Sequence, residues 1–535
     1  MLGFQLRLTE RAAQPMIAYV SHLSPSMPRT DPRPNILFVM FDQMAALSLP
    51  IYGHPVVKAP HMARLAARGT LFENAYCASP LCSPSRFAML TSRLPSRIGA
   101  YDNAAELPAS VPTLLHHLRN AGYRTCLSGK MDFTGADQLH GYEERLTTDL
   151  SPSDFGWVPD WEHPTQVQPW FHTLQSVAEA GPCDHSLSLQ YDEEACQQAV
   201  HWLHAAANRF DARPFMLTLS IMHPHDPYQG PRRFWDLYKD MEIDPPAEVK
   251  RKAKDRNAVE RRMFALYDRD EIPVSARQIR RARRAYYAMI SYCDDVLGRL
   301  LSALEVSGLS DNTVVVVTSD HGDMLGERGL WYKMNFYERA VRVPLLFAGP
   351  GIKTRRRISE AVSHLDLLPT LGGLVGARVG RSDPDGRDLA PALKGGALKQ
   401  GDVVGEYMGE GYDAPVVMIR RGARKFIHSA TDGPELYDLA RDSQELRNLA
   451  IEPAHRGAVD ALVAEANRRW DFQRIRAEVI ASQRQRRTIH AALTTGRIAP
   501  WDYAAKSEPA TSYYRNYDSA RPDPDRLLRR PRPAG

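Results

Sequence analysis

Four apolar runs of strand length recur along the chain, and each ends on polar, chemically capable side chains. They read NILFVMFDQ (35–43), YRTCLSGK (123–130), PFMLTLSIMHPH (214–225) and NTVVVVTSDHGD (312–323). A continuous apolar run is typical of a strand that is buried on both faces of a parallel sheet. The runs therefore predict the central strands of a mostly parallel sheet.

Helical patterns lie between these strands. The segment 60–69 (PHMARLAARG) is expected to close at Gly69, and 110–122 (SVPTLLHHLRNAG) to begin at the N-cap Ser110 and end before Gly122. Strands that alternate with helices predict an α/β fold in which helices flank a doubly wound sheet.

Ligands of such sheets bind beyond the carboxyl ends of the strands. Asp42, Lys130, His225 and Asp320 all stand at or just after the ends of predicted strands. They are far apart in sequence, yet this topology gathers them into one crevice. The crevice is the first indication of where the function lies.

The chain of 535 residues is long enough for two or more domains. From Asp402 onward, short strands with Gly-containing turns precede a helical stretch from Pro453 to about Arg487. We predict four parts: an irregular extension over 1–34, a main α/β domain over 35–400, a smaller α+β domain over 401–500, and a C-terminal tail over 501–535.

Charge, hydropathy and cysteine usage limit the class of protein. The net charge is only +5, and the basic runs Arg277–Arg284 and Arg484–Arg487 have the pattern of solvated helix faces, so we expect no nucleic-acid partner. No stretch has the apolar length of a membrane span, and the N-terminus lacks a secretory pattern. The six cysteines form no CxxC pair. These features predict a cytoplasmic protein with no membrane partner and free thiols.

Two groups of side chains at the strand ends suggest chemistry. Asp42, Gln43, Asp320 and His321 are ligands of the kind that hold Ca²⁺, Mg²⁺ or Mn²⁺. For any one of them alone a helix cap or a turn is the better interpretation, but several strand ends that carry such residues together favour a metal site.

The second group consists of cations. Arg86, Lys130, His225 and Lys333 are the side chains required around a developing oxyanion. The alternatives are an exposed surface charge for Arg86 and Lys333, and a turn histidine for His225. His223 is a rival to His225 in the same HPH string.

The string Cys82-Ser83-Pro84-Ser85-Arg86 resembles the signature C/S-x-P-x-R of the sulfatase family, since Cys82, Pro84 and Arg86 occupy its three fixed positions. The resemblance extends from Asn35 over nearly the whole chain and is closest to the choline sulfatase subfamily, through strings such as GYRTCLSGKM, FGWVPDW and MHPHDPY.

This resemblance implies an alkaline-phosphatase-like α/β fold with a smaller C-terminal domain, and a divalent cation, usually calcium. It also implies oxidation of Cys82 to formylglycine by a maturation enzyme. The hydrate of that aldehyde is the nucleophile in the family. A homo-oligomer, dimer or tetramer, is implied too, with the tail reaching toward a neighbouring site.

The resemblance also implies roles for single residues. Asp42, Gln43, Asp320 and His321 hold the cation together with the converted Cys82, and Arg86 steadies the hydrate. Lys130 and Lys333 contact the sulfate, and His225 lies near the leaving oxygen. Trp157 and Glu406 match the positions that hold the quaternary ammonium of choline, with Trp161, Tyr407, Asp502 and Asp518 as weaker candidates.

One position departs from the subfamily, which reads GKMHF where this chain reads GKMDF. An ionised Asp132 accepts hydrogen bonds only and repels an anion, unless Lys130, a metal or a raised pKa compensates. Asp132 therefore has three interpretations: a catalytic base, a mark of a different ester, or the cause of a weak enzyme.

The sequence thus predicts a sulfuric ester hydrolase that converts choline-O-sulfate, a small-molecule sulfate ester, into choline and sulfate. The alternatives are a phosphonate monoester or phosphodiester hydrolase on the same platform, and a weakly active choline-ester-binding pseudoenzyme.

Overall fold

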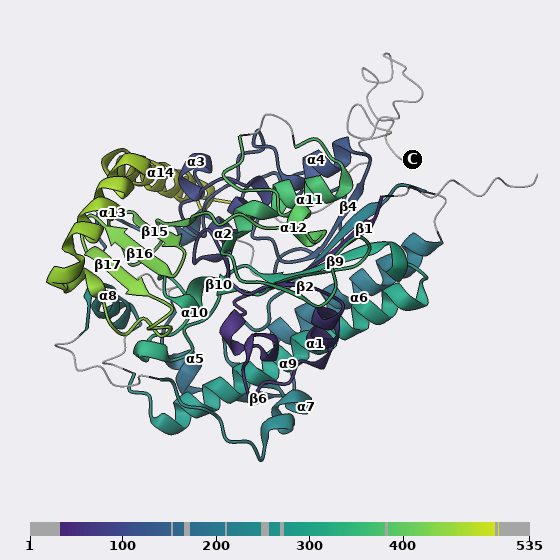
Figure 1. The fold of residues 1–535 in the computed structure, drawn as a ribbon, viewed down its shortest axis with the longest axis horizontal. Coiled ribbons are helices and arrows are strands. Elements are labelled where there is room, and N and C mark those ends of the chain that lie inside the picture. Colours follow the sequence, from purple (N-terminus) through teal and green to yellow (C-terminus); the bar gives the residue numbers. More distant parts are fainter. Residues whose placement is uncertain are drawn as a thin grey trace, which may run out of the picture.

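A computed structural model describes residues 31, 33–150, 154–164, 172–208, 211–247, 256–267, 272–379, 383–497 and 501. Nearly all of the predicted N-terminal extension and the tail beyond Trp501 lie outside these described residues. The described chain forms four sheets. The two largest are a large sheet between layers of helices and a small sheet with its own helices, as Figure 1 shows.

The large sheet has eight strands in the order β12-β2-β11-β9-β1-β7-β4-β5. The strands β9, β1, β7, β4 and β5 run parallel, whereas β11 runs antiparallel to both of its neighbours. This confirms the predicted α/β fold with a mostly parallel sheet. The bounds are β1 Asn35–Phe41, β2 Gly69–Phe72, β4 Arg124–Gly129, β5 Glu144–Arg145, β7 Phe215–Ile221, β9 Thr313–Ser319, β11 Leu345–Ala348 and β12 Arg356–Ile358.

Helices cover both faces of this sheet, which is why its central strands are continuously apolar. Every residue of β1, β7 and β9 is buried. In Figure 1, α6 and α9 lie on one side of the sheet, and α2, α4 and α11 on the other. Their bounds are α2 Cys82–Thr91, α4 Leu114–Asn120, α6 Leu187–Ala207, α9 Ala276–Val306 and α11 Leu367–Val375.

The register aligns the strand ends at one edge. Phe41 at the end of β1 is the partner of Ser319 at the end of β9, so Asp42 and Asp320 follow neighbouring strands side by side. This alignment is the structural basis of the site described below.

Two predicted helix boundaries differ from those in the structure. The helix α4 begins after Thr113 and not after Ser110, because Thr113 and His116 form the capping box; Gly122 follows its end with a φ of +84°. Gly69 does not close α1 (Pro60–Ala67) but is the first residue of β2, where a Cβ would collide with the carbonyl oxygen of Phe347.

The small sheet is antiparallel, in the order β14-β15-β16-β17. Its strands are β14 Val403–Tyr407, β15 Val416–Arg421, β16 Arg424–Ser429 and β17 Gly433–Asp438. The helical stretch that follows is two helices, α13 Arg456–Arg469 and α14 Phe472–Leu493, separated at Trp470 and Asp471.

The two basic runs are only partly solvated. Arg283 is fully buried, and its guanidinium pairs with Asp244 and Glu327. Arg486 is likewise buried and forms two hydrogen bonds with Asp102, at 2.5 and 2.7 Å, which fasten α14 to the main domain. A helix face that meets another layer of the protein buries its arginines when acids stand opposite.

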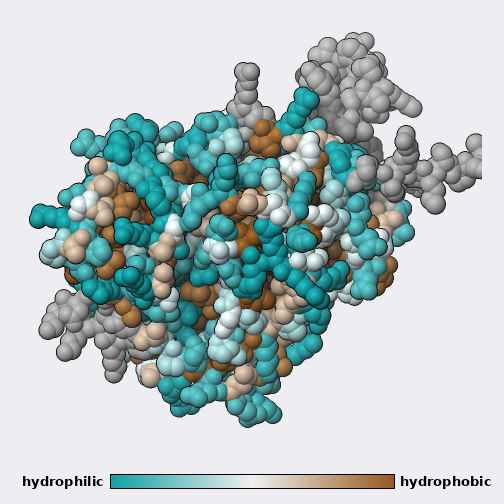
Figure 2. Space-filling model, in the orientation of Figure 1, coloured by the Kyte–Doolittle hydropathy of each residue, from teal (hydrophilic) through white to brown (hydrophobic). Residues whose placement is uncertain are grey.

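Hydrophilic residues cover most of the face in Figure 2, and hydrophobic residues are scattered among them. Among the helices of the described ranges, none combines the length and the apolar character that a membrane crossing requires.

Candidate active site

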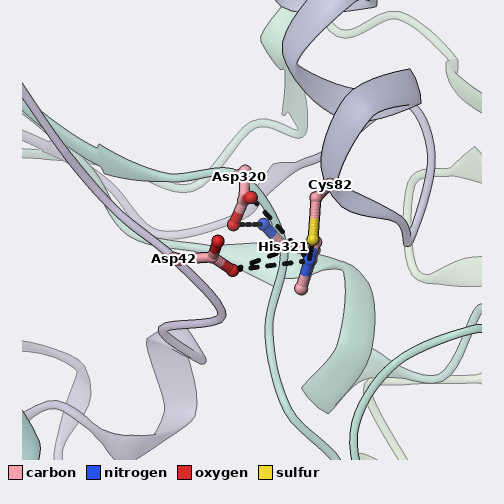
Figure 3. A group of neighbouring side chains, drawn as sticks. All are labelled: Asp42, Cys82, Asp320 and His321. Carbon is pink, nitrogen blue, oxygen red and sulfur yellow. Dashed lines mark hydrogen bonds and ion pairs between the residues drawn. The ribbon is translucent and has the colours of Figure 1, made fainter. Parts of the chain in front are cut away.

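Four side chains converge at the carboxyl edge of the large sheet. Asp42 follows β1, Asp320 and His321 follow β9, and Cys82 is the first residue of α2. Figure 3 shows these side chains pointing toward one another, and their possible ligand atoms all lie within 4.8 Å. The Cys82 sulfur is 3.2 Å from His321 Nε2 and 3.9 Å from Asp42 Oδ1.

Two cations neutralise the carboxylates of this group. The Arg86 guanidinium, one turn after Cys82, pairs with Asp320 Oδ2 at 2.9 Å and with Asp42 Oδ2 at 3.3 Å. Lys130 Nζ lies 2.5 Å from Asp42 Oδ2. Burial alone would raise the pKa of Asp42, but the positive charges, Lys130 foremost, outweigh it and hold that pKa well below its usual range.

The donor set suits a divalent cation. Asp42 directs Oδ2 to Lys130 and Arg86, whereas its Oδ1 faces Cys82 and His321. Burial and the Lys333 charge help to lower the pKa of His321 to about 4, so its imidazole is neutral and has a lone pair to offer. Two carboxylates and one neutral imidazole in a buried cluster fit a hard cation.

Gln43 lies beside this cluster with its amide oriented by neighbours. Its Nε2 donates to Asp323 Oδ2 at 2.7 Å, and its Oε1 accepts from Lys333 Nζ at 2.6 Å. The backbone N–H of Gln43 donates to Asp320 Oδ1 at 3.0 Å. The amide oxygen of Gln43 is therefore engaged by Lys333.

Of the four converging residues Asp42, Cys82, Asp320 and His321, Cys82 lines a cavity of about 230 Å³. The cavity is lined by Cys82, Asn103, Lys130, Asp132, Asp149, Leu150, Trp157, His172, Ser188, Met222, His225, Asp226, Pro227, Lys333 and Glu410. Its volume accommodates a small organic ester. The structure thus brings Cys82, Lys130, Asp132, Trp157, His225 and Lys333, all expected at the site, into one cavity wall.

His225 has both ring nitrogens occupied. Its Nδ1 donates to the carbonyl oxygen of Asp226 at 2.7 Å, and its Nε2 accepts from Lys333 Nζ at 2.6 Å. Burial, followed by the Lys333 charge, lowers the pKa of His225 to about 3. His172, His225 and Asp226 could by spacing alone hold a metal, but this hydrogen bonding leaves His225 no lone pair for one.

His223 points away from the cavity. Its ring Nδ1 lies 2.6 Å from Asp192 Oδ2, and the ring packs edge-on against Tyr292. Of the two histidines in the HPH string, only His225 lines the cavity.

Asp132 forms ion pairs with two cations but a hydrogen bond with neither. Its Oδ2 is 3.4 Å from both Arg86 Nε and Lys130 Nζ and has no hydrogen-bond partner within the described chain. The residue is 4% exposed, and burial raises its pKa to about 6 despite both cations. The backbone beside it is fixed by Asp149, which accepts the Met131 N–H at 2.8 Å.

The structure does not bring Glu406 to the cavity. Glu406 lies within β14, where its carboxylate accepts hydrogen bonds from Ser96 and from Trp470 Nε1, so both of its oxygens are used in packing. Trp161 is buried in the small-sheet core, where its Nε1 donates to Gly409 O.

Glu410, four residues after Glu406, lines the cavity instead. Its Oε2 is buried without a hydrogen-bond partner in the described chain, and burial raises its pKa to about 7. Sequence reasoning missed this second glutamate of GEYMGEG, because both glutamates lie in one short string and nothing in its pattern separates them.

Comparisons with known proteins identify the class to which this site belongs. The family model described as Sulfatase matches residues 34–377. The chain therefore belongs to the sulfatase family, enzymes that hydrolyse sulfuric esters and generally use a metal ion and a formylglycine.

Within that family, the model described as Choline sulfatase enzyme C terminal matches residues 477–519. The chain is 42% identical to the Choline-sulfatase of Rhizobium meliloti (strain 1021) over 499 residues, which is 91% of this chain and 97% of that protein. Arylsulfatase K of Gallus gallus is 29% identical over 454 residues, 80% of this chain and 81% of that protein.

Solved structures share the fold. A putative sulfatase from Bacteroides thetaiotaomicron VPI-5482 superposes with a TM-score of 0.66 at 25% identity, covering 82% of this chain and 92% of that chain. The phosphonate monoester hydrolase SpPMH from Silicibacter pomeroyi has a TM-score of 0.68 at 23% identity, covering 82% and 95%.

Proposed function

We propose that this sulfatase hydrolyses choline-O-sulfate to choline and sulfate. The similarity to a choline sulfatase over 91% of the chain supports this substrate. The observation that carries the proposal is the buried carboxyl of Glu410 in the wall of the small cavity, whose Oε2 has no hydrogen-bond partner among the described residues.

Glu410 and Trp157 suit the ammonium end of this ester. A quaternary ammonium cannot donate a strong hydrogen bond, so it is held by aromatic faces and by negative charge. Burial keeps the pKa of Glu410 near 7, and a cation beside it would lower that pKa and ionise the carboxyl. We assign to Glu410 the role that the sequence suggested for Glu406.

Lys130, Lys333 and His225 suit the sulfate end. Lys130 and Lys333 provide fixed positive charge for the sulfate oxygens as negative charge develops on them. His225 hydrogen-bonds Lys333, so these two side chains share the place where the leaving alcohol oxygen requires a proton.

Cys82 would carry the nucleophile. If it is converted to formylglycine, its hydrate would supply a hydroxyl to attack sulfur, and a divalent cation, Ca²⁺ foremost, would lower the pKa of that hydroxyl. Asp42, Asp320 and His321 would hold the cation, with Gln43 beside them. Arg86 keeps the carboxylates of Asp42 and Asp320 in place.

Asp132 would act as a proton carrier at the base of the cavity. Its raised pKa lets it exchange a proton near neutral pH, and its free Oδ2 is available to a group in the cavity. The second candidate reaction, hydrolysis of a phosphonate monoester or phosphodiester, is suggested by the same residue, because Asp132 stands where the choline sulfatase subfamily has a histidine.

The test compares three esters on protein co-expressed with a formylglycine-generating enzyme. Conversion of Cys82 is verified by a mass loss of about 18 Da in the peptide that contains it. We expect the highest kcat/KM for choline-O-sulfate, a lower one for 4-nitrophenyl sulfate and the lowest for a phosphodiester. A phosphodiester preference would reverse the assignment, and full conversion without any turnover would indicate a pseudoenzyme.

The cellular setting belongs to the same proposal: a cytoplasmic homo-oligomer, dimer or tetramer, matured by a formylglycine-generating enzyme. All six cysteines are free thiols, which suits a reducing compartment. Light scattering on the purified protein measures the oligomeric number.

A further inference from the structure

The loop that carries His225 is held from outside by one buried carboxylate. This loop, residues 222–228, leaves β7 at the cavity edge. Asp192, on α6, accepts three hydrogen bonds from its first two residues: from Met222 N at 2.7 Å, from His223 N at 2.9 Å and from His223 Nδ1 at 2.6 Å.

The far end of the loop is held in the same way. Tyr228 donates its hydroxyl hydrogen to Asp323 Oδ2 at 2.8 Å. Between the two anchors, His225 reaches Lys333 with a contact of 2.6 Å. The position of His225 therefore depends on both ends of a short loop, and the end nearest to β7 depends on Asp192.

Asp192 has no exposed surface, so water cannot replace its hydrogen bonds. An asparagine has almost the same shape but offers one acceptor oxygen and one donor amide. In either orientation the amide nitrogen would face a backbone N–H, that of Met222 or that of His223, a donor against a donor. The loop must then shift, and a displacement of 1 Å at a reacting group can reduce the rate about 100-fold.

We propose that Asp192 and His223 form a positioning pair that places His225 and, through its hydrogen bond, the proton-bearing Lys333 ammonium against the leaving-group oxygen of the ester. The inference rests on the proposed role of His225 in the same cavity. It accounts for both histidines of the HPH string: His225 faces the substrate, and His223 faces the anchor.

The leaving group distinguishes positioning from a general loss of structure. An alkyl sulfate releases a strongly basic alkoxide, which requires protonation, whereas 4-nitrophenyl sulfate releases a stable phenolate that hardly does. A defect that acts through His225 thus reduces alkyl sulfate turnover and spares the aryl sulfate. A merely structural defect reduces both equally.

The experiment measures kcat and KM of converted, metal-loaded Asp192→Asn on choline-O-sulfate, ethyl sulfate and 4-nitrophenyl sulfate, alone and combined with His225→Ala. Asp294→Asn is the matched control, because Asp294 is equally buried and accepts the backbone N–H groups of His61 and Met62, away from the cavity. Peptide mass and thermal midpoint establish equal conversion and folding.

We expect Asp192→Asn to lose roughly 100-fold in kcat on the alkyl sulfates and less than about 3-fold on the aryl sulfate, with no further loss in the His225→Ala background. Equal losses on all three esters, or additive losses with His225→Ala, would overturn the positioning pair. If ethyl sulfate is hydrolysed and choline-O-sulfate is not, the proposed substrate fails, while the comparison of leaving groups still decides the role of Asp192.

Discussion

Asp132 should reduce the stability of the protein that contains it. The fold raises the pKa of this carboxyl from its usual 3.8 to about 6, chiefly by burial. The native state therefore binds the Asp132 proton more tightly than the unfolded state does. Stability from this group is fully present below pH 3.8, falls as the pH rises through the interval up to 6, and stays low above it.

The size of this effect follows from the two pKa values. The two pKa values differ by about two units, and each unit corresponds to about 1.36 kcal/mol, so the free energy of unfolding changes by about 3 kcal/mol. The substitution Asp132→Asn keeps the shape of the side chain and removes its charge, so the variant gains that amount at pH 8. With an unfolding entropy of about 2.1 cal/mol/K per residue, a chain of 535 residues gains about 1 °C per kcal/mol.

The assay is differential scanning calorimetry of the unconverted, chelator-treated protein at pH 8 and pH 4.5. We expect Asp132→Asn to unfold about 3 °C above the parent at pH 8, and within about 1 °C of it at pH 4.5. Asp149→Asn is the control: Asp149 is paired with Arg145 and accepts the Met131 N–H, so its substitution lowers the midpoint. A lower midpoint of Asp132→Asn at pH 8 would refute the reasoning, since it would mean that the ion pairs outweigh burial.

Three further outcomes are expected. Glu410→Gln should raise KM for choline-O-sulfate about 10- to 100-fold and leave KM for ethyl sulfate unchanged. Because the pKa of Glu410 is about 7, KM of the parent enzyme for choline-O-sulfate should rise as the pH falls below 7. KM of the variant should not change over this pH range. Arg486→Ala leaves Asp102 buried and unpaired, so calorimetry should show a loss of about 3–5 kcal/mol; an unchanged midpoint would contradict the buried pair. Adding Ca²⁺ to the chelated protein at 100 times its Kd should stabilise it by about 2.7 kcal/mol, and Asp42→Asn should abolish this response in calorimetry.

The sequence alone was enough to predict the site residues whose positions follow from the topology of the sheet. Asp42 and Asp320 follow runs that are apolar throughout, and only parallel neighbours in one sheet make such runs end together. That Cys82 and Arg86 lie close together could likewise be predicted, because side chains four residues apart in a helix lie on the same face.

The direction in which a side chain points could not be predicted from the sequence alone. Glu406 and Glu410 are both plausible ligands of an ammonium group, but Glu406 lies inside β14 and points to Ser96 and Trp470, whereas Glu410 follows the strand. The string GEYMGEG contains both glutamates, and its pattern does not distinguish Glu406 from Glu410. The helix start at Thr113 was missed for a related reason, since Ser110 is an equally good cap by residue type and only the capping box with His116 decides.

The ion pair of Arg486 and Asp102 joins residues that are 384 positions apart in the chain. It can therefore form only late in the synthesis of the protein. Asn103, next to Asp102, belongs to the cavity wall, so a ribosome must deliver nearly the whole polypeptide before that wall is fastened. If Cys82 is converted to formylglycine as proposed, an oxidising enzyme would have to reach it before folding ends, since the folded side chain is only 3% exposed. Completion of translation would then close the interval for that conversion and fasten the cavity wall in one event.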